Sequence, residues 1–543
     1  MDEVASGGET VDALSRWRAE LAHPATTTVS LRRAASLAES LVRSHDLAGA
    51  IAVADEALSL ATGLDVILDL RCVRAVAILD EGRVPDDLHD TANALIARAD
   101  ERWAAALDEV SKAQAQVASA RDVINVDAAR PLASAAARRL WQSMRLLFHR
   151  SLHTSHPLSP LAQSPDEWLS SLHSSALYFA LQPSGPRRRK WWTTRKPSVA
   201  CVTTGSSFLE PVVEAAIGAG MPVISLPLAD LVSPRPSLAA LLGERVVGLV
   251  DPAVSEVVVP GVLVGVDVVF VDWADEAAAW ASVRLPVSGP RLVVRLHSVE
   301  ALSAAVHVVD WSRVDRLVFV SEFLRRLTHA VVPATRSVDS VVVGHGVVSA
   351  GVGVKSAGAW STLGMVGWGQ VVKDPLFAVE VLALLRARDP QRDWRLRLIG
   401  RELREGIRSW ESDYADDVER RMADPVVAGA IEVTGFTDDV NAELQEVGFI
   451  LSSSLRESMH LGLFEGVLSG AVPVVRDWPV VAPWGGAREL FPADWIVQTP
   501  EQAADRVLSV TNPETVGRQA AAWGHVHSSV KKAASGYVKA LRP

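Results

Sequence analysis

The chain has 543 residues, too many for one hydrophobic core, and this length favours about three or four domains. Hydrophobic residues make up 49% and charged residues 22% of the chain, a composition that excludes an intrinsically disordered protein. The formal net charge of −10 argues against a nucleic-acid partner, and Cys72 and Cys201 lie too far apart for a zinc motif or a disulfide framework.

Residues 1–20 lack the basic and apolar segments of a secretory signal peptide. The most apolar stretch, residues 246–273, is interrupted by acidic residues, prolines and glycines, whereas a membrane span needs about 20 consecutive apolar residues. We therefore interpret the stretch as buried strands. We expect a cytoplasmic protein whose only membrane contact is peripheral, at the inner face.

Residues 1–185 have alanine and leucine at intervals of three and four, which predicts an α-helical domain. Within it, residues 31–62 predict two helices joined by a turn at His45 and Asp46, similar to one tetratricopeptide-type hairpin. No second copy follows at a fixed period, so a helical bundle is favoured over a repeat array with a peptide-binding groove. The domain is a candidate surface for a polymer acceptor, a protein partner or a second copy of the chain.

Residues 186–197 predict a basic linker, because Arg and Lys there flank Trp191 and Trp192 between two prolines. Such a segment binds anionic lipid headgroups or a polyanionic acceptor in some proteins. The alternative is a solvated linker whose tryptophans pack on a neighbouring domain. We favour this solvated linker over a segment that binds lipid or a polyanion.

From residue 198 onward, short apolar runs alternate with helical patterns, which predicts α/β domains with parallel sheets at 198–350 and 351–520. A small-residue stretch at 349–361 is the expected hinge, and a C-terminal helix is expected over 521–543 inside a helical stretch at 514–541. Ligands of such sheets bind at the carboxyl ends of the strands, so a cleft is expected between the two lobes. The expected strands are 199–202, 223–226, 246–250, 268–271, 292–296, 317–320, 340–343, 363–366, 396–399, 430–433, 449–451, 472–475 and 495–498, with helices that include 209–218 and 300–308.

The segment 455–475 carries the strongest functional signal. Glu457 lies in a loop after an apolar strand, and Glu465 lies about one to two turns into a helix expected to begin near Met459. Peptide N–H groups at the start of that helix, over Ser458, Met459, His460 and Leu461, are free to bind an anion or a hydroxyl. At about 1.5 Å of rise per residue, the two carboxylates lie roughly 10 Å apart, which suits a ligand with two hydroxylated ends.

This segment resembles the retaining glycosyltransferase family 4, whose members have the GT-B architecture of two Rossmann-like lobes. Family members have two glutamates with seven residues between them at a strand-to-helix turn, as Glu457 and Glu465 have, and then a small-residue turn before a P-V-V strand. The resemblance covers residues ~198 to ~520. It implies that Glu457 contacts the transferred sugar and that Glu465 contacts the ribose of the donor.

Further positions match the same family. Gly367 and Lys373 resemble its first donor-lobe turn, where the lysine neutralises the departing β-phosphate. His297, after an apolar strand, resembles the first-lobe histidine near the reaction centre. Gly435 resembles a turn beside the nucleobase. The loop after the first strand contains Gly205 and Ser206, which we assign to the acceptor side as a backbone approach to a phosphate or sugar.

Two residues depart from the family pattern. Trp368 stands where many members have a basic residue, so Arg401 or Arg456 is needed as a second cation for the diphosphate. His460 replaces the usual glycine.

The resemblance implies transfer of a sugar from a nucleoside diphosphate donor to an acceptor hydroxyl with retained configuration, without a metal or other cofactor. We expect the acceptor to be a glycan, a lipid-linked molecule or a protein. The alternatives are a nucleotide-sugar 2-epimerase of the same architecture and an inactive scaffold, which Trp368 and His460 favour. The C-terminal helix is expected to return to the first lobe and to couple closure to donor binding, so that deletion of residues 530–543 changes donor affinity.

Overall fold

The structure is a computed structural model, and it divides into two compact units. The helical unit contains Met1–Leu152, Glu167–Gln182 and Leu238–Glu256, and the α/β unit contains His153–Asp166, Pro183–Ser237 and Val257–Pro543. The residues that the structure describes are 15, 17, 19, 28–116, 124–154, 156, 158–182, 196–205, 208–254, 260–348, 351–405 and 407–542. Most of the basic linker at 186–197, with Trp191 and Trp192, lies outside them.

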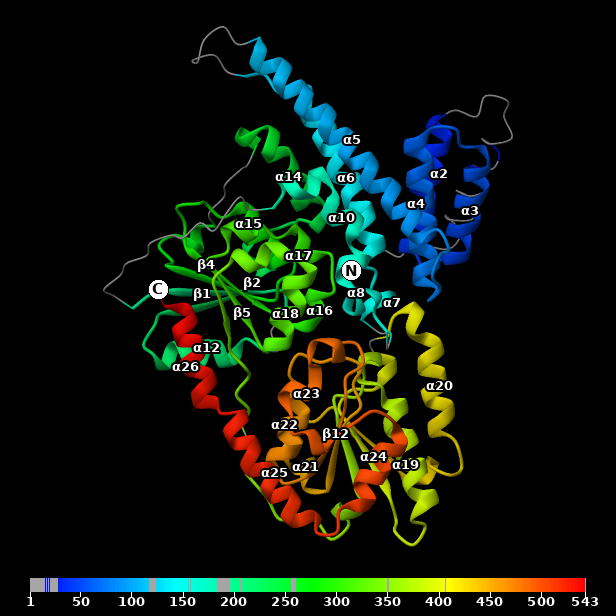
Figure 1. Ribbon diagram of the computed structural model, residues 1–543, viewed down its shortest axis with the longest axis vertical. Coiled ribbons are helices and arrows are strands. Elements are labelled where there is room, and N and C mark those ends of the chain that lie inside the picture. The colour runs from blue at the N-terminus through cyan, green and yellow to red at the C-terminus, as the bar shows by residue number, and fades with distance from the viewer. Residues whose placement is uncertain are drawn as a thin grey trace. The chain divides into compact units, whose positions relative to one another are not determined.

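The helical unit begins with the expected hairpin. Helix α2 ends at Arg43, His45 adopts a left-handed conformation (φ 62°), and the Asp46 carboxylate accepts a hydrogen bond from Gly49 N at 2.9 Å to begin α3. Small and aliphatic residues such as Ala34, Leu41, Val53 and Leu70 fill the core between α2, α3 and α4. The long helices α5 and α6 pack against each other beside them (Figure 1). The helices are α2 (Thr28–Arg43), α3 (Leu47–Leu60), α4 (Leu64–Asp80), α5 (Leu88–Ala115), α6 (Ala129–Leu147), α7 (Arg150–His153), α9 (Pro165–Trp168), α10 (Ser170–Ser174), α11 (Ala176–Ala180) and α14 (Leu238–Val250).

Helix α14 corrects one prediction. The strand expected at 246–250 is wrong, because these residues form the last turns of a helix that buries Leu242, Val246 and Val250 at four-residue spacing. A short apolar run does not distinguish a buried strand from a buried helix. The helix belongs to the helical unit, where Arg245 Nη2 donates to the Leu181 carbonyl at 2.7 Å.

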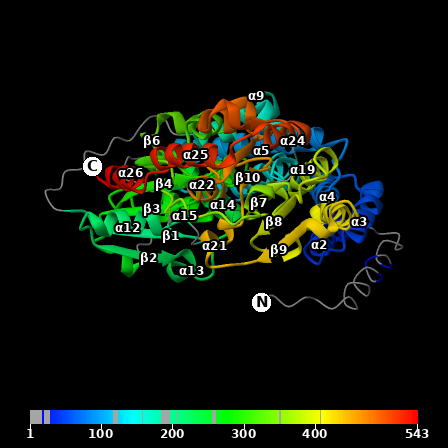
Figure 2. The same ribbon diagram turned by 90° about the horizontal axis from the view of Figure 1, so that it is seen from below.

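The first lobe of the α/β unit is a six-stranded parallel sheet in the order β2-β1-β3-β4-β5-β6. Val199 pairs with Val223 on one side and with Val268 on the other, so these strands begin in register. The buried valines of β1 and β3 reflect helices on both faces (Figure 2). The strands are β1 (Val199–Thr203), β2 (Val223–Pro227), β3 (Val268–Asp272), β4 (Arg291–Leu296), β5 (Arg316–Phe319) and β6 (Ser340–Val342).

The second lobe is another six-stranded parallel sheet, in the order β12-β11-β10-β7-β8-β9. The sequence predicted every strand of both sheets, and the fold class of two doubly wound lobes with an all-helical N-terminal region is confirmed. Its strands are β7 (Thr362–Val366), β8 (Arg395–Ile399), β9 (Ile431–Gly435), β10 (Phe449–Ser452), β11 (Val472–Arg476) and β12 (Ile496–Val497).

The helices of the α/β unit cover these sheets. The helix expected at 300–308 is two short helices instead, because the chain turns between α16 and α17 at Leu302 (φ −106°, ψ 21°). No helix among the described residues is long and apolar enough to cross a bilayer. The helices are α8 (Pro160–Gln163), α12 (Glu210–Gly218), α13 (Leu228–Leu231), α15 (Glu276–Arg284), α16 (Ser298–Ala301), α17 (Ala305–Val308), α18 (Glu322–Val331), α19 (Pro375–Arg388), α20 (Ser412–Met422), α21 (Val440–Gln445), α22 (Leu461–Leu468), α23 (Gly486–Leu490), α24 (Pro500–Ser509), α25 (Pro513–His527) and α26 (Val530–Leu541).

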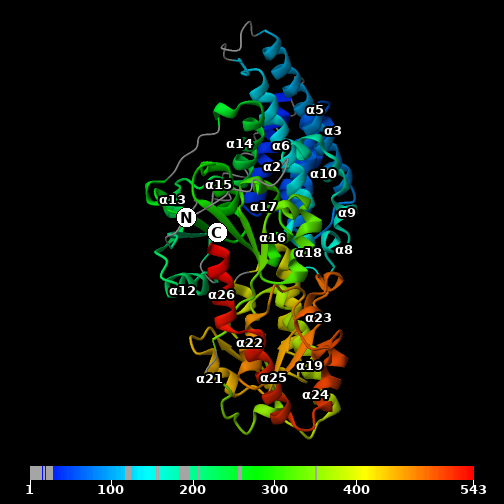
Figure 3. The same ribbon diagram turned by 60° about the vertical axis from the view of Figure 1, so that its left-hand side comes forward.

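The C-terminal segment returns to the first lobe, as expected, but the single helix expected over 521–543 is interrupted at Ser528 and Ser529, between α25 and α26. Helix α25 packs on α22 of the second lobe, and α26 packs on α12 of the first (Figure 3). Tyr537 and Leu541 are fully buried in the same core cluster as Val199 and Phe270 of the first sheet. The chain therefore crosses between the lobes twice, once before β7 and once before α26.

Candidate active site

The two glutamates of the motif flank the start of α22. Strand β10 ends at Ser452, Glu457 follows in a loop, and α22 begins at Leu461 with His460 as its N-cap. The helix thus starts two residues later than the sequence predicted. Among the described residues, none accepts a hydrogen bond from the peptide N–H groups of residues 458–461. These N–H groups can bind an anion at the positive end of the helix.

Lys373 forms an ion pair with Glu457. The lysine lies in the short 3-10 helix Val371–Lys373 after β7, and its Nζ is 2.6 Å from Glu457 Oε1. Ser454 Oγ donates to the same carboxylate oxygen at 2.7 Å. Burial alone would raise the pKa of Glu457, but the charge of Lys373, with smaller contributions from His460 and Ser454, lowers it to about 2. The carboxylate is therefore ionised at neutral pH.

The loops that carry this pair are fixed to each other. Ser453 Oγ donates to the Lys373 carbonyl at 2.7 Å, and Leu455 N donates to the Val372 carbonyl at 2.8 Å. Asp374, in a left-handed conformation (φ 49°), accepts from Tyr414 Oη at 2.6 Å and pairs with Arg476. Several hydrogen bonds therefore hold the lysine backbone in place.

His460 is a buried, neutral residue at the base of α22. Its Nδ1 lies 2.7 Å from Ser452 Oγ, which also accepts from Trp478 Nε1 at 3.1 Å. Burial lowers the pKa of His460 to about 4, although the Glu457 carboxylate acts in the opposite direction. The imidazole thus helps to hold the helix start against β10.

Ser458 and Met459 connect the two lobes. Ser298 N donates to Ser458 Oγ at 2.7 Å, and His345 N points to Met459 Sδ at 3.2 Å. Arg456 also reaches the first lobe, where its Nη1 donates to Ser298 Oγ. Because these side chains contact the first lobe, only the backbone of Ser458 and Met459 is left to face a donor.

His297 follows β4 and directly precedes Ser298, so it lies close to the start of α22. Its Nε2 is 3.3 Å from Asp272 Oδ1, and its ring lies 4.5 Å from the Trp273 ring centroid. The side chain is only 5% exposed. Burial lowers its pKa, so the imidazole is neutral at neutral pH.

A buried ion pair beneath His297 was not predicted. Arg295 donates to both oxygens of Asp272, at 2.7 and 2.8 Å, and its Nη1 donates to Tyr537 Oη of α26 at 2.8 Å. Arg295 and Asp272 are fully buried. A signal was present in the sequence, because an arginine inside an apolar strand and an aspartate at the end of another need each other as partners.

Three glycine turns meet at the strand ends of the second lobe. Gly367, Gly400 and Gly435 all have positive φ (75°, 119° and 69°). Gly367 N donates to the Ile399 carbonyl at 2.8 Å, and Gly400 N donates to the Gly435 carbonyl at 2.9 Å. The predicted residues Gly367 and Gly435 therefore lie on either side of the Gly400 turn, and a Cβ atom at either would meet no atom within 4 Å.

The second cation was predicted at Arg401 or Arg456. Trp368 is a core residue (4% exposed) and contributes no charge. Arg401 is exposed, and its guanidinium carbon lies 5.6 Å from the Phe436 ring centroid. Arg456 contacts the first lobe as described.

Glu465 is half-buried in α22. Burial raises its pKa, and no hydrogen-bond donor to its carboxylate is found in the described part of the chain. At the acceptor-side loop, Gly205 N donates to Thr203 Oγ1 at 3.0 Å, and a side chain added at Gly205 would meet open space. Ser206 lies outside the described residues. Within those residues, no group of three or more His, Cys, Asp or Glu could hold a metal ion.

No protein-family model matches the chain, and a search of curated proteins finds no match. Among solved structures, an O-GlcNAc transferase mutant of Thermobaculum terrenum is 16% identical, with 95% of this chain and 97% of that chain covered, at a TM-score of 0.44. HepE of Anabaena in complex with UDP-glucose is 14% identical over 64% and 99% of the chains, at 0.47. A mutant of S. aureus TarM in complex with fondaparinux, alpha-GlcNAc-glycerol and UDP is 10% identical at 0.41, over 51% of this chain and 55% of that one. These likenesses concern the backbone, and this chain spans about half the length of TarM.

Proposed function

We propose that the protein is a glycosyltransferase that moves a sugar from a nucleoside diphosphate donor to an acceptor hydroxyl. The observation that carries the proposal is the Lys373–Glu457 ion pair beside the unpaired peptide N–H groups that begin α22. A diphosphate needs positive charge and N–H donors, and a sugar needs a carboxylate acceptor for its hydroxyls. This arrangement supplies all three at the carboxyl end of a parallel sheet, where such folds bind ligands.

In this proposal, cleavage of the bond between the sugar and the β-phosphate leaves negative charge on the phosphate oxygens. The Lys373 ammonium and the N–H groups of residues 458–461 stabilise that charge, in the role that a divalent ion has in other enzymes. Glu457 accepts hydrogen bonds from the transferred sugar. Glu465 accepts hydrogen bonds from the ribose hydroxyls, since no donor among the described residues occupies its carboxylate. The turns at Gly367 and Gly435 face the nucleotide.

The acceptor side belongs to the first lobe. His297, neutral and next to the lobe contact at Ser298, lies on the acceptor path with Gly205 and Ser206. The family resemblance of the sequence supports transfer with retained configuration. We propose a glycan, a lipid-linked molecule or a protein as the acceptor of a cytoplasmic enzyme that works with no metal.

Isothermal titration with UDP, GDP and ADP tests the proposal. We expect one nucleotide to bind to the full chain and to bind more weakly to the Lys373→Ala variant. A protein that binds none of the three is an inactive scaffold, and the proposal fails. Incubation with the matching nucleotide-sugar alone then separates the reactions, because an epimerase converts the donor without an acceptor, whereas a transferase releases nucleotide and needs an acceptor for efficient turnover.

A further inference from the structure

A charged cavity of about 530 Å³ lies inside the helical unit. None of the residues that line it belongs to the candidate active site. Helices α2, α4, α5 and α6 line it. Five guanidinium groups and three carboxylates face it, with small residues such as Ala35 and Ala135 between them. The chain as a whole has a net charge of −10, so a local excess of arginine needs an explanation.

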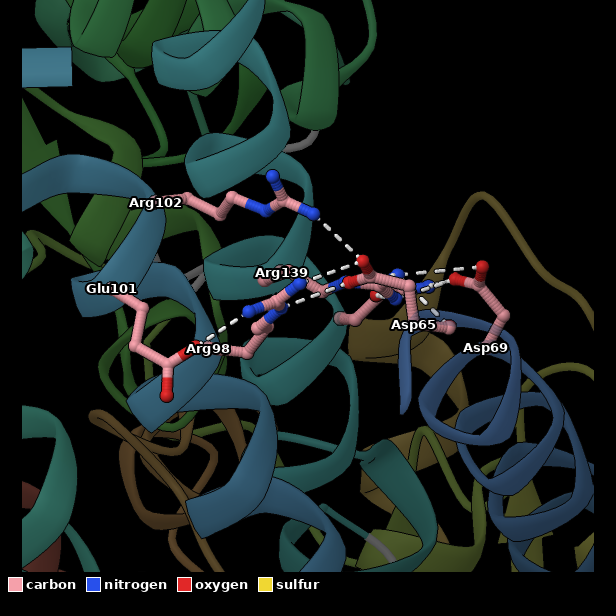
Figure 4. A network of polar contacts seen from close by, with 7 residues as sticks. Asp65, Asp69, Arg98, Glu101, Arg102 and Arg139 are labelled. Carbon is pink, nitrogen blue, oxygen red and sulfur yellow. Dashed lines mark hydrogen bonds and ion pairs between the residues drawn. The ribbon is translucent and has the colours of Figure 1, made fainter. Parts of the chain in front are cut away.

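The carboxylates that line the cavity already have partners. Asp65 accepts from Arg98 at 2.9 Å, from Arg102 at 2.7 Å and from Arg139 at 3.1 Å (Figure 4). The hydrogen bond from Arg98, with those from the other arginines, holds the pKa of Asp65 well below its usual range although burial opposes the shift. This carboxylate therefore stays ionised, and hydrogen bonds from three arginines occupy it.

The two remaining carboxylates are occupied in the same way. Asp69 accepts from Arg139 Nη1 at 2.6 Å and from Gln142 Nε2 at 2.8 Å. Glu39 pairs with Arg145 at 3.0 Å. Arg98 and Arg145 do not line the cavity, so part of the acidic charge of its wall is neutralised from outside.

Three exposed arginines of the lining, which together form what we call the rim, lack such partners. Arg32 and Arg43 lie on one face of α2, at the spacing of three helical turns, and Arg138 lies on α6. Within the described part of the chain, no carboxylate pairs with any of the three. Their side chains are exposed, and all three line the cavity. The result is a cavity whose carboxylates are neutralised and whose exposed arginines carry positive charge.

We propose that this cavity binds a phosphoryl-bearing ligand, with Arg32, Arg43 and Arg138 as its contacts. Guanidinium forks match the oxygens of a phosphate in pairs, and several forks around one small cavity favour a group with more than one negative charge. Arg139, almost fully buried and fixed by Asp65 and Asp69, forms a rigid base beneath the rim. The site is independent of the proposed transferase reaction, because no residue is shared with the donor site.

Pyrophosphate titration of the full chain tests this site. The candidate donor site also has chemistry for a diphosphate, so we use the Lys373→Ala variant as the background for every measurement. In that background we expect binding that weakens at least about tenfold, or 1.4 kcal/mol, in the Arg43→Gln/Arg138→Gln double variant. Raising the salt concentration should also weaken binding, because the rim is exposed.

Arg33→Gln is the matched control. Arg33 neighbours Arg32 on α2, is exposed and does not line the cavity, so this variant should keep the affinity within about twofold. Circular dichroism confirms that each variant is folded. Glycerol phosphate in place of pyrophosphate distinguishes a monoester ligand from a diphosphate one. Equal affinity of the double variant and its background overturns the proposal, as does an equal loss in the Arg33→Gln control.

Discussion

Lys373 and Glu457 are 84 residues apart in the sequence, yet their side chains form a 2.6 Å ion pair. The lysine side chain is 18% exposed and the glutamate side chain 13% exposed. A pair that is this well shielded costs more to break than a surface pair, because the remaining partner keeps a poorly solvated charge.

Lys373→Ala and Glu457→Ala should each lower turnover with the cognate donor by about 100-fold or more, because each removes a group that acts on the transition state. Both variants should remain folded, which circular dichroism checks, and steady-state kinetics gives the loss. The matched control is Arg388→Ala, which removes another 2.6 Å ion pair, between Arg388 of α19 and Asp505 of α24, whose side chains are 34% and 70% exposed. Wild-type turnover in either site variant rejects the assignment.

Glu300 should make the stability of the protein depend on pH. Its side chain is buried (3% exposed), and burial raises its pKa to about 8, from 4.5 in the unfolded chain. Its contribution to stability is therefore complete below pH 4.5 and is lost as the pH rises toward 8. Glu300→Gln keeps a carbonyl oxygen for the N–H groups of Ala274 and His297 but does not titrate.

Urea unfolding at pH 5 and pH 8 measures this effect. We compare the free energy of unfolding of the Glu300→Gln variant with that of the wild type. The difference should shift in favour of the variant by more than about 1 kcal/mol from pH 5 to pH 8, since one unit of pKa difference is worth 1.36 kcal/mol. Glu402→Gln, at an exposed glutamate, is the control and should show no such gain. A constant difference between Glu300→Gln and wild type at the two pH values contradicts a titrating carboxyl at this position.

Gly346→Ala should destabilise the packing of α26. A Cβ atom at Gly346 would lie 2.5 Å from the Cα of Val530, the first residue of that helix, and backbone atoms cannot move aside as a side chain does. We expect a loss of about 1–3 kcal/mol in the free energy of unfolding. Gly358→Ala is the control, because a Cβ there meets no atom within 4 Å and its φ of −83° suits alanine. Equal stability of the two variants would show that α26 does not pack in this way.

The two cysteines should report the stability of the two units separately. Cys72 belongs to the helical unit and Cys201 to the α/β unit, and both are fully buried. Burial raises the pKa of each thiol to about 12, so almost no thiolate is present at pH 8.

Labelling with a thiol reagent at pH 8 should therefore be slow in the native protein and should follow unfolding as urea is added. Mass spectrometry of the labelled peptides gives one transition for each cysteine. The fully unfolded chain, in which both thiols react at once, is the control. Immediate labelling of either cysteine in the native protein contradicts its burial.

The sheets were predictable because their pattern is local. Valine-rich runs such as residues 268–271 end in polar or glycine residues. These residues mark the end of each strand, so the strand can be predicted from its local sequence alone. The run at 246–250 has the same composition, but its environment is α6 and the helical unit. Its conformation depends on a tertiary contact, which the local pattern does not contain.

The individual residues of the site were predictable from the sequence, but the contacts between them were less so. The motif identified Glu457 and Lys373 separately, and the structure brings them together. It also places Trp368 in the core and the His460 imidazole beneath α22, which no spacing rule indicates. The contact of Arg295 with Tyr537 joins residues 242 apart, and a single sequence gives no measure of such a distance.

The return of α26 has a consequence for how the protein is made. During translation β1 to β6 leave the ribosome first, but the residues that complete their core, among them Tyr537 and Leu541, are synthesised after the whole second lobe. Contacts of such long sequence separation slow folding, and an incomplete core leaves apolar surface exposed. The first lobe to be synthesised is thus expected to be the last to finish folding, and the nascent chain has to remain soluble until then.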